Sequence, residues 1–233
     1  MEARELQPRR RFLQGAVGLT LALASTGLRA GAKEAKGEDD VSPTEDLMRE
    51  HGVLRRILLV YAEVIRRIEA KQEVPSDPVA RAALVIKSFI EDYHERDEEE
   101  FIFPRFQKAG QMTDLVGVLL AQHQAGRQLT ANIQRLANAA ALNGTAGRQE
   151  IADSMRQFIR MYEPHAARED TVLFPAFGKL IGEKELHKLM EIFEQKERAL
   201  PLGDFEKMVT DVAAIERTFG IYDLAQFTPT VKS

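Results

Sequence analysis

Two segments of this chain combine the residue types that bind metal ions with the spacing of a helix. They are His94–Phe106 and His165–Phe177, and both read His, three residues, Glu, four residues, Phe-Pro-x-Phe. Residues four apart lie on the same face of a helix. Each segment can therefore direct an imidazole and a carboxylate, from Glu98 or Glu169, toward a single point.

Each motif is preceded by another histidine at nearly the same distance. His51 lies 43 residues before the first motif histidine, and His123 lies 42 residues before the second. Both have a leucine four residues before them and an arginine four residues after them. The duplication predicts a pseudo-twofold site with four imidazoles and two carboxylates. The six predicted ligands are His51, His94, Glu98, His123, His165 and Glu169.

Six ligands of these types suit two metal ions better than one. A carboxylate has two oxygens and can bridge a pair of ions, while each ion keeps two histidines. Imidazole and carboxylate without thiolate favour non-haem iron, with manganese or zinc as weaker candidates. We therefore expect two iron ions, with open positions left for an oxo or hydroxo bridge, water or a diatomic gas.

The elements that would position these ligands are helices. Apolar residues and His51 recur every three or four residues after Pro43, and no stretch alternates with a period of two. The pattern predicts an all-α fold: an up-down-up-down four-helix bundle with two additional C-terminal helices. The expected helices are 43–71, 78–108, 112–140 and 147–178, followed by 183–199 and 204–218.

The ordered set of histidines and glutamates resembles the hemerythrin-like family, also called the HHE cation-binding family, over roughly residues 43–180. The resemblance implies a four-helix bundle that holds an oxo-bridged diiron centre. Oxygen-carrying hemerythrins have a fifth histidine, and here Arg127 stands at that position. Their fourth-helix aspartate corresponds to Asp170, but the duplicated spacing favours Glu169 as the ligand.

The resemblance also bounds the expected function. A four-histidine set is more similar to family members proposed to handle nitric oxide or to repair iron centres than to oxygen carriers. We expect binding or sensing of oxygen, nitric oxide or peroxide. The alternatives are a diiron oxidase, peroxidase or nitric oxide reductase, or an iron store or donor for metal-centre repair. A ferritin-like site needs Glu-x-x-His twice, and only Glu91–His94 fits.

Several polar residues near the motifs have a simpler interpretation. Tyr162 is expected to pack in the core, and His187 to lie on the surface. The arginines that follow the lone histidines are expected to be surface charges rather than partners of the site. The acids beside the first motif, Glu95, Glu99 and Glu100, are expected to form a solvated face, with Glu95 as a reserve ligand. The two arginines are Arg55 and Arg127.

The N-terminus predicts export. Arg9-Arg10-Arg11-Phe12-Leu13 leads into a moderately apolar stretch that ends at Ala30-Gly31-Ala32, which is typical of a twin-arginine signal and its cleavage site. A retained membrane anchor is the alternative. We expect a periplasmic or otherwise exported protein that uses the export machinery and keeps no stable anchor after cleavage. The expected divisions are a signal over 1–32, a linker over 33–42, the bundle over 43–180 and an extension over 181–233.

Composition excludes several other classes of function. The formal net charge is −4, so no basic stripe is available to neutralise the phosphates of a nucleic acid. The chain has no cysteine, which excludes disulfides, zinc-thiolate sites and thiol catalysis. The sequence leaves the oligomeric state open.

Overall fold

A computed structural model describes residues 41–231, and within this range the chain is helical with no strand. The predicted all-α class is therefore confirmed for these residues. The predicted export signal over 1–32 lies outside the described residues, as does the predicted linker up to residue 40. Within residues 41–231, no helix combines the length and the apolar character that crossing a lipid bilayer requires.

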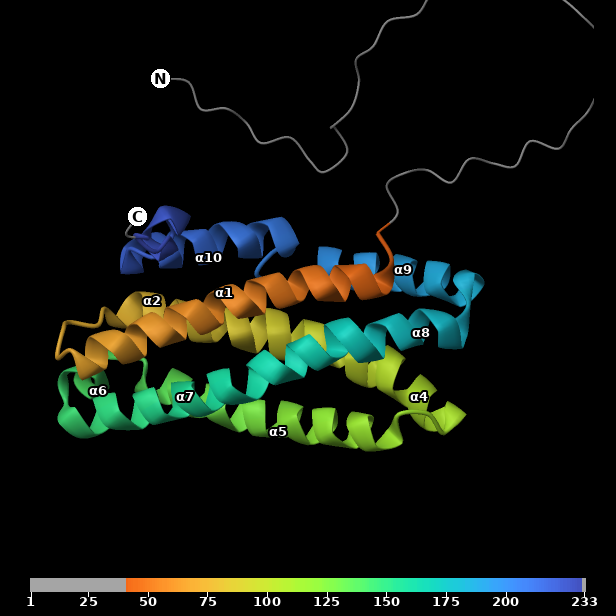
Figure 1. The fold of residues 1–233 in the computed structure, drawn as a ribbon, viewed down its shortest axis with the longest axis horizontal. Helices are drawn as coiled ribbons and strands as arrows, with labels where there is room; N and C mark the ends of the chain where they lie inside the picture. The colour runs from red at the N-terminus through yellow and green to blue at the C-terminus, as the bar shows by residue number, and fades with distance from the viewer. Residues whose placement is uncertain (1–40, 232–233) are drawn as a thin grey trace, which may run out of the picture. The chain divides into compact units, whose positions relative to one another are not determined.

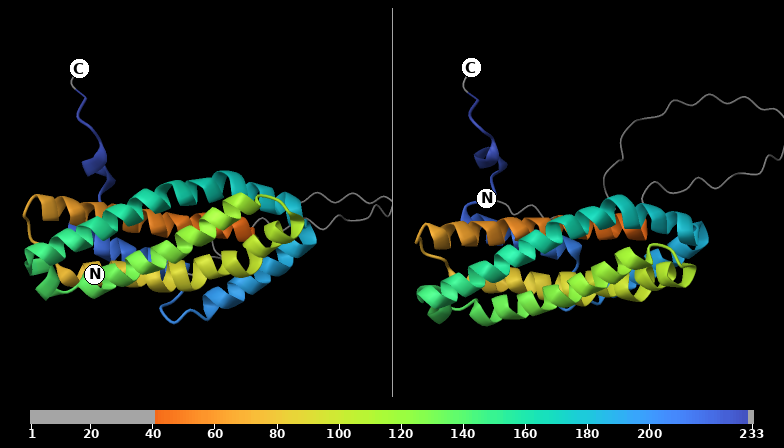
Figure 2. Two further views of the ribbon diagram at one scale, coloured as in Figure 1. Left: turned by 90° about the horizontal axis from the view of Figure 1, so that it is seen from below. Right: turned by 60° about the horizontal axis from the view of Figure 1, so that its bottom comes forward.

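Four long helical runs lie side by side (Figures 1 and 2). The second and fourth runs are each built from several segments without a break. The first run is α1 (Pro43–Glu69), and the second comprises α2 (Ser76–Val85), η1 (Ile86–His94), α3 (Glu95–Asp97), η2 (Glu98–Ile102) and α4 (Phe103–Ala109). The third is α5 (Thr113–Leu136), and the fourth comprises α7 (Thr145–Arg168), η3 (Glu169–Leu173) and α8 (Phe174–Ile181).

The remaining helices join or cover these runs. The short α6 (Ala139–Asn143) connects α5 to α7, and η4 (Leu224–Phe227) follows the last helix. α9 (Glu183–Arg198) packs on α1 and α8, whereas α10 (Phe205–Phe219) packs on α1 and α2. Figure 1 shows α10 running along α1. The two C-terminal helices that the sequence predicts are therefore present.

Local chemistry explains where the first helix begins and the third ends. At the start of α1, the Ser42 side chain accepts a hydrogen bond from the Glu45 amide at 3.3 Å, and the Glu45 carboxylate accepts one from the Ser42 amide at 2.9 Å. This reciprocal pair satisfies two amides that a helix start leaves without partners. α5 ends at Leu136, short of the predicted residue 140, because the Asn138 side chain accepts from the Ala141 amide at 3.0 Å and begins α6.

Both motifs pass through a π-helical segment of five residues immediately before Phe-Pro. η2 begins at Glu98 and η3 begins at Glu169, so each motif carboxylate lies on the first residue of such a segment. Pro104 and Pro175 lack an amide proton, and their rings clash with the carbonyl four residues earlier in a regular α-helix. A wider turn relieves this conflict, and such turns occur frequently at functional sites.

The apolar core forms two clusters. The larger one contains Tyr61, Phe89 and Phe158, with α10 packed against it. The smaller one gathers the four phenylalanines of the two motifs, together with Leu189 and Phe193 of α9. The two motifs therefore meet in one apolar cluster.

The close approach of α6 to α7 depends on a glycine. A Cβ atom at Gly147 would lie 2.4 Å from the Ala141 carbonyl oxygen and 2.8 Å from its Cα. We predict that Gly147→Ala lowers the free energy of unfolding by about 1–3 kcal/mol, as overpacking does elsewhere. The control is Gly117→Ala, since a Cβ there meets nothing within 4 Å and alanine favours a helix by up to about 1 kcal/mol. Denaturant unfolding measures both variants, and equal effects would contradict the prediction.

Candidate metal centre

The structure brings all six predicted ligand residues together in the interior. Each of them is 4% exposed or less. They come from all four long helical runs, because each run carries one histidine and the second and fourth runs add a glutamate. Their elements are α1 for His51, η1 for His94, η2 for Glu98, α5 for His123, α7 for His165 and η3 for Glu169.

The ligand atoms form two groups, which we call half-sites. The first half-site is His51, His94 and Glu98, and the second is His123, His165 and Glu169. Within each half-site, one ligand atom from every residue lies within 4.8 Å of the others. In the first half-site the Nε2 atoms of the two histidines are 3.1 Å apart. Each half-site thus offers two imidazoles and one carboxylate to a single ion.

The two carboxylates also connect the half-sites. Oε2 of Glu98 lies 3.7 Å from His94 Nε2 and 3.4 Å from His123 Nε2. Oε2 of Glu169 lies 3.1 Å from His165 Nε2 and 3.4 Å from His51 Nε2. Each glutamate therefore faces a histidine of both half-sites through its Oε2 atom.

The outer nitrogen of every histidine is held by another side chain. Carboxylate and amide oxygens accept hydrogen bonds, so the Nδ1–H donates and Nε2 presents its lone pair to the centre. Metal-binding histidines are almost always oriented in this way. The acceptors are Asp170 for His51 at 2.7 Å, Glu50 for His94 at 2.7 Å, Glu99 for His123 at 3.0 Å and Gln122 for His165 at 2.8 Å.

The donor set fits cations. Both carboxylate oxygens of Glu98 and of Glu169 are buried without a hydrogen-bond partner, and so is His123 Nε2. Burial, followed by the charge of Glu169, raises the pKa of Glu98 well above its usual range. Buried charges in proteins are paired or coordinate metals. Two cations between the half-sites would satisfy all of these atoms.

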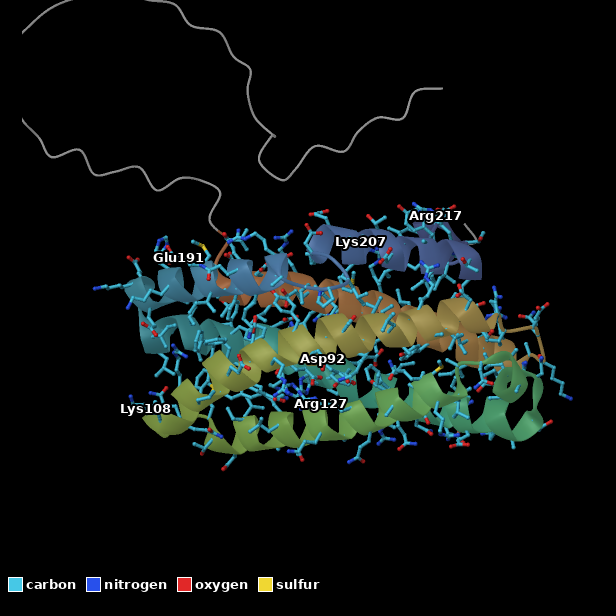
Figure 3. The ribbon with its side chains drawn as sticks, turned by 180° about the vertical axis from the view of Figure 1, so that it is seen from behind. Asp92, Lys108, Arg127, Glu191, Lys207 and Arg217 are labelled. Carbon is cyan, nitrogen blue, oxygen red and sulfur yellow. The ribbon has the colours of Figure 1, made fainter. Side chains whose placement is uncertain are left out.

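The arginines after the lone histidines are partners of the site, so the expectation of surface charges was wrong. Arg55 forms an ion pair with Asp170, the residue that holds His51. Arg127 lies 2.7 Å from the Glu99 carboxylate, which holds His123. In Figure 3, Arg127 lies between α5 and the second helical run. Their side chains are 48% and 30% exposed, because only the guanidinium reaches inward.

A solvated face was also the wrong expectation for Glu95, which is 1% exposed. Its Oε1 accepts a hydrogen bond from the Tyr162 hydroxyl at 2.5 Å, and its Oε2 lies 2.8 Å from the Arg127 guanidinium. Tyr162 packs in the core as expected, but its hydroxyl has this polar role as well. The position of the Tyr162 hydroxyl requires a glycine at residue 126, because a Cβ at Gly126 would lie 2.1 Å from the Tyr162 oxygen.

Other expectations for individual residues are met. Glu100 is exposed at the surface, and so is His187, with a side-chain exposure of 63%. Asp170 occupies the outer nitrogen of His51, whereas Glu169 points to the centre. The geometry thus favours Glu169 over Asp170 as the inner carboxylate.

Sequence reasoning missed Glu50 and Gln122, and it gave no outer role to Glu99. A signal for all of these was present in the duplication. Glu50 and Gln122 immediately precede the lone histidines, while Glu99 and Asp170 immediately follow the motif glutamates. Polar residues at matched places in both halves indicate a shared task.

A third group, Glu95, Glu99 and His123, also has ligand atoms within 4.8 Å of one another. Arg127 lies 2.8 Å from Glu95 and 2.7 Å from Glu99. The guanidinium remains charged at any relevant pH and pairs with both acids, which disfavours another cation beside them. This group therefore positions His123 and does not form a further cation site.

Comparison with known proteins agrees with this geometry. The hemerythrin HHE cation binding domain model matches residues 42–177. The chain belongs to this family. It is 45% identical over 204 residues to an uncharacterized protein of Mycobacterium tuberculosis and to one of Mycobacterium bovis, covering 84% of this chain and 80% of each relative. No solved structure matches the chain. Family membership and the two half-sites together indicate a metal-binding protein.

The pairing of Tyr162 with Glu95 can be measured by a double-mutant cycle. We predict that Tyr162→Phe and Glu95→Ala are coupled by about 0.5–3 kcal/mol, the range for residues in contact. Denaturant unfolding of the two single variants and the double variant gives the coupling. The control is Tyr61→Phe, which removes another buried hydroxyl but one without a hydrogen-bond partner. Tyr61→Phe should not couple to Glu95→Ala.

Proposed function

We propose that this protein binds two non-haem iron ions, bridged by Glu98 and Glu169 and by an oxo or hydroxo group, within an up-down-up-down bundle. The observation that carries the proposal is the position of each glutamate between histidines of both half-sites. The proposed ligands are the six residues of the half-sites. Imidazole and carboxylate donors without thiolate suit iron better than zinc or manganese in a two-ion site.

The proposed activity is the binding or sensing of oxygen, nitric oxide or peroxide. Two histidines and two bridging carboxylates give each ion four bonds from the protein, which leaves coordination positions open. Iron supplies reversible binding and redox chemistry at such positions. The buried setting excludes bulk water and limits the ligands to small molecules. Arg127 occupies the position of the additional histidine of oxygen carriers, which favours binding or sensing over carriage.

A diiron redox enzyme is the second candidate, and one observation favours it. Tyr162 and Glu95 form a buried hydrogen-bonded pair beside the second half-site, where the Tyr162 and His165 ring centroids are 5.3 Å apart. A hydroxyl and a carboxyl group so placed can hold and move a proton during turnover. An oxidase, peroxidase or nitric oxide reductase would use such a pair.

We also propose that the protein is exported through the twin-arginine route and acts in the periplasm or beyond it. The support is the Arg9-Arg10-Arg11-Phe12-Leu13 run and the small residues at 30–32. Export of a folded protein would allow iron to be inserted before translocation. The exported form would carry no membrane anchor once residues 1–32 are removed.

Metal analysis tests the diiron proposal directly. We predict about two iron ions per chain in the purified protein, and loss of at least one of them in His94→Ala and in His165→Ala, because ligand removal weakens a metal site. His187→Ala is the matched control, since this histidine is exposed on α9. Less than about one iron per chain, or equal iron content in all of these variants, would contradict the proposal.

The same preparation separates binding from catalysis. Simple binding predicts a reversible change in the optical spectrum when oxygen or nitric oxide is added to the reduced protein, with no turnover. A redox enzyme predicts repeated turnover of peroxide or nitric oxide in the presence of a reductant. Tyr162→Phe should then slow turnover and leave the spectral change on binding in place.

Export has its own test. We predict that replacing both Arg9 and Arg10 with lysine retains the protein in the cytoplasm, because the twin-arginine route depends on the arginine pair. Cell fractionation with detection of the full-length and processed chains measures the outcome. Continued export of the variant would point to another route.

A further inference from the structure

A second group of polar side chains is buried in the bundle, apart from the six ligand residues and the side chains that hold them. Its members are Tyr61 of α1, Glu91 of η1 and Thr130 of α5, and each is 1% exposed or less. Both Glu91 oxygens and the two hydroxyls are buried without a hydrogen-bond partner. Such atoms destabilise a fold unless something satisfies them.

The three side chains belong to one group, although they come from three different helical runs. Burial raises the pKa of Glu91, and the Thr130 hydroxyl beside it acts in the opposite direction. Burial also raises the pKa of Tyr61, and the charge of Glu91 adds to this increase. We call these residues the Glu91 group.

The internal duplication shows that Glu91 lacks a partner that its counterpart has. Glu91 lies three residues before His94, and Tyr162 lies three residues before His165. The Tyr162 hydroxyl donates to the Glu95 carboxylate at 2.5 Å. No side chain of residues 41–231 gives the Glu91 oxygens an equivalent hydrogen bond. The partner of Glu91 must therefore come from outside the protein chain.

The Glu91 group approaches the surface at Lys87. The Lys87 Nζ atom lies 3.5 Å from Glu91 Oε2 and 2.6 Å from the Asp92 carboxylate. The Lys87 side chain is 40% exposed, so Glu91 lies next to a side chain that contacts solvent. In Figure 3, Asp92 and Arg127 mark the seam between the second helical run and α5.

The donors and acceptors of the Glu91 group select a small neutral molecule. An anion would face the Glu91 carboxyl group. A further cation would compete with Lys87 and Arg127, whose charges already act on this carboxyl group. A neutral molecule that both donates and accepts hydrogen bonds suits two carboxyl oxygens and two hydroxyls, and internal water typically makes about three such bonds.

We propose that Tyr61, Glu91 and Thr130 bind ordered internal water. The site is independent of the proposed iron centre. It does not depend on the protonation state of Glu91 either, because a carboxyl group accepts hydrogen bonds from water in both states. Glu91 is close enough for its charge to act on Glu95 and Tyr162. The water therefore lies on the side of the bundle that holds the Tyr162–Glu95 pair.

The direct test is a crystal structure of the full chain at a resolution that shows ordered water. We expect a water oxygen within about 3.0 Å of a Glu91 oxygen and of the Thr130 or Tyr61 hydroxyl. A direct hydrogen bond between Glu91 and Thr130 with no water beside them would overturn the inference. A metal ion or an organic molecule at this place would overturn it as well.

The stability of Thr130→Val tests the same inference in solution through the sign of its effect. Valine removes the hydroxyl and keeps the branched shape, and the two residues have similar helix propensities. Loss of a hydrogen bond to water should lower the ratio of folded to unfolded protein about two- to tenfold. Removal of a hydroxyl that has no partner would instead raise this ratio. Denaturant unfolding of the protein as purified measures the change.

Thr218→Val is the matched control, because Thr218 is exposed on α10 and the same exchange there gives its effect at the surface. Tyr61→Phe repeats the test at the other hydroxyl of the group and should also be less stable than the unmodified chain. A gain in stability of Thr130→Val relative to this control, or of Tyr61→Phe relative to the unmodified chain, would overturn the inference.

Discussion

The burial of two carboxylates without hydrogen-bond partners is the constraint on which the rest of this structure depends. Glu98 and Glu169 are fully buried, and all four of their oxygens lack a donor. Transfer of an ion from water to a protein interior costs several kcal/mol even after relaxation. Cations held among the four imidazoles would offset that cost. The helices must therefore meet at this depth, and each imidazole must present Nε2 to the centre.

The fold meets this demand by packing the ligand histidines against both apolar clusters. His51 stacks on Phe174 and His123 stacks on Phe103, with ring centroids 5.7 and 5.5 Å apart. On the other side, the His165 and Tyr162 ring centroids are 5.3 Å apart. The π-helical segments at 98–102 and 169–173 each begin at an inner glutamate and end just before a Phe-Pro pair. The turn that accommodates the proline thus begins at the glutamate. One sequence feature thereby sets both the packing of the helix end and the place of the carboxylate.

The sequence was enough to predict that these six residues come together because two independent regularities agreed. The i, i+4 spacing placed His94 with Glu98 and His165 with Glu169, and the duplication paired the halves. The groups around the histidines were harder to predict. Arg55, Arg127 and Glu95 are charged residues for which a solvated position is the ordinary expectation. Whether such a residue is buried depends on partners from other helices, and spacing along one helix does not specify them.

The duplication also limits what symmetry can explain. It places the inner donors at matched positions in both halves, and it repeats the Asp170–Arg55 pair as Glu99–Arg127. The departures lie in the residues around the ligands. Glu50 in the first half corresponds to Gln122 in the second, and Glu91 corresponds to Tyr162. The two halves therefore differ in the residues around their histidines, while the six inner donors stay matched. Because a substitution in that surrounding layer leaves the inner donors in place, it can alter the setting of a histidine without removing that histidine from the centre.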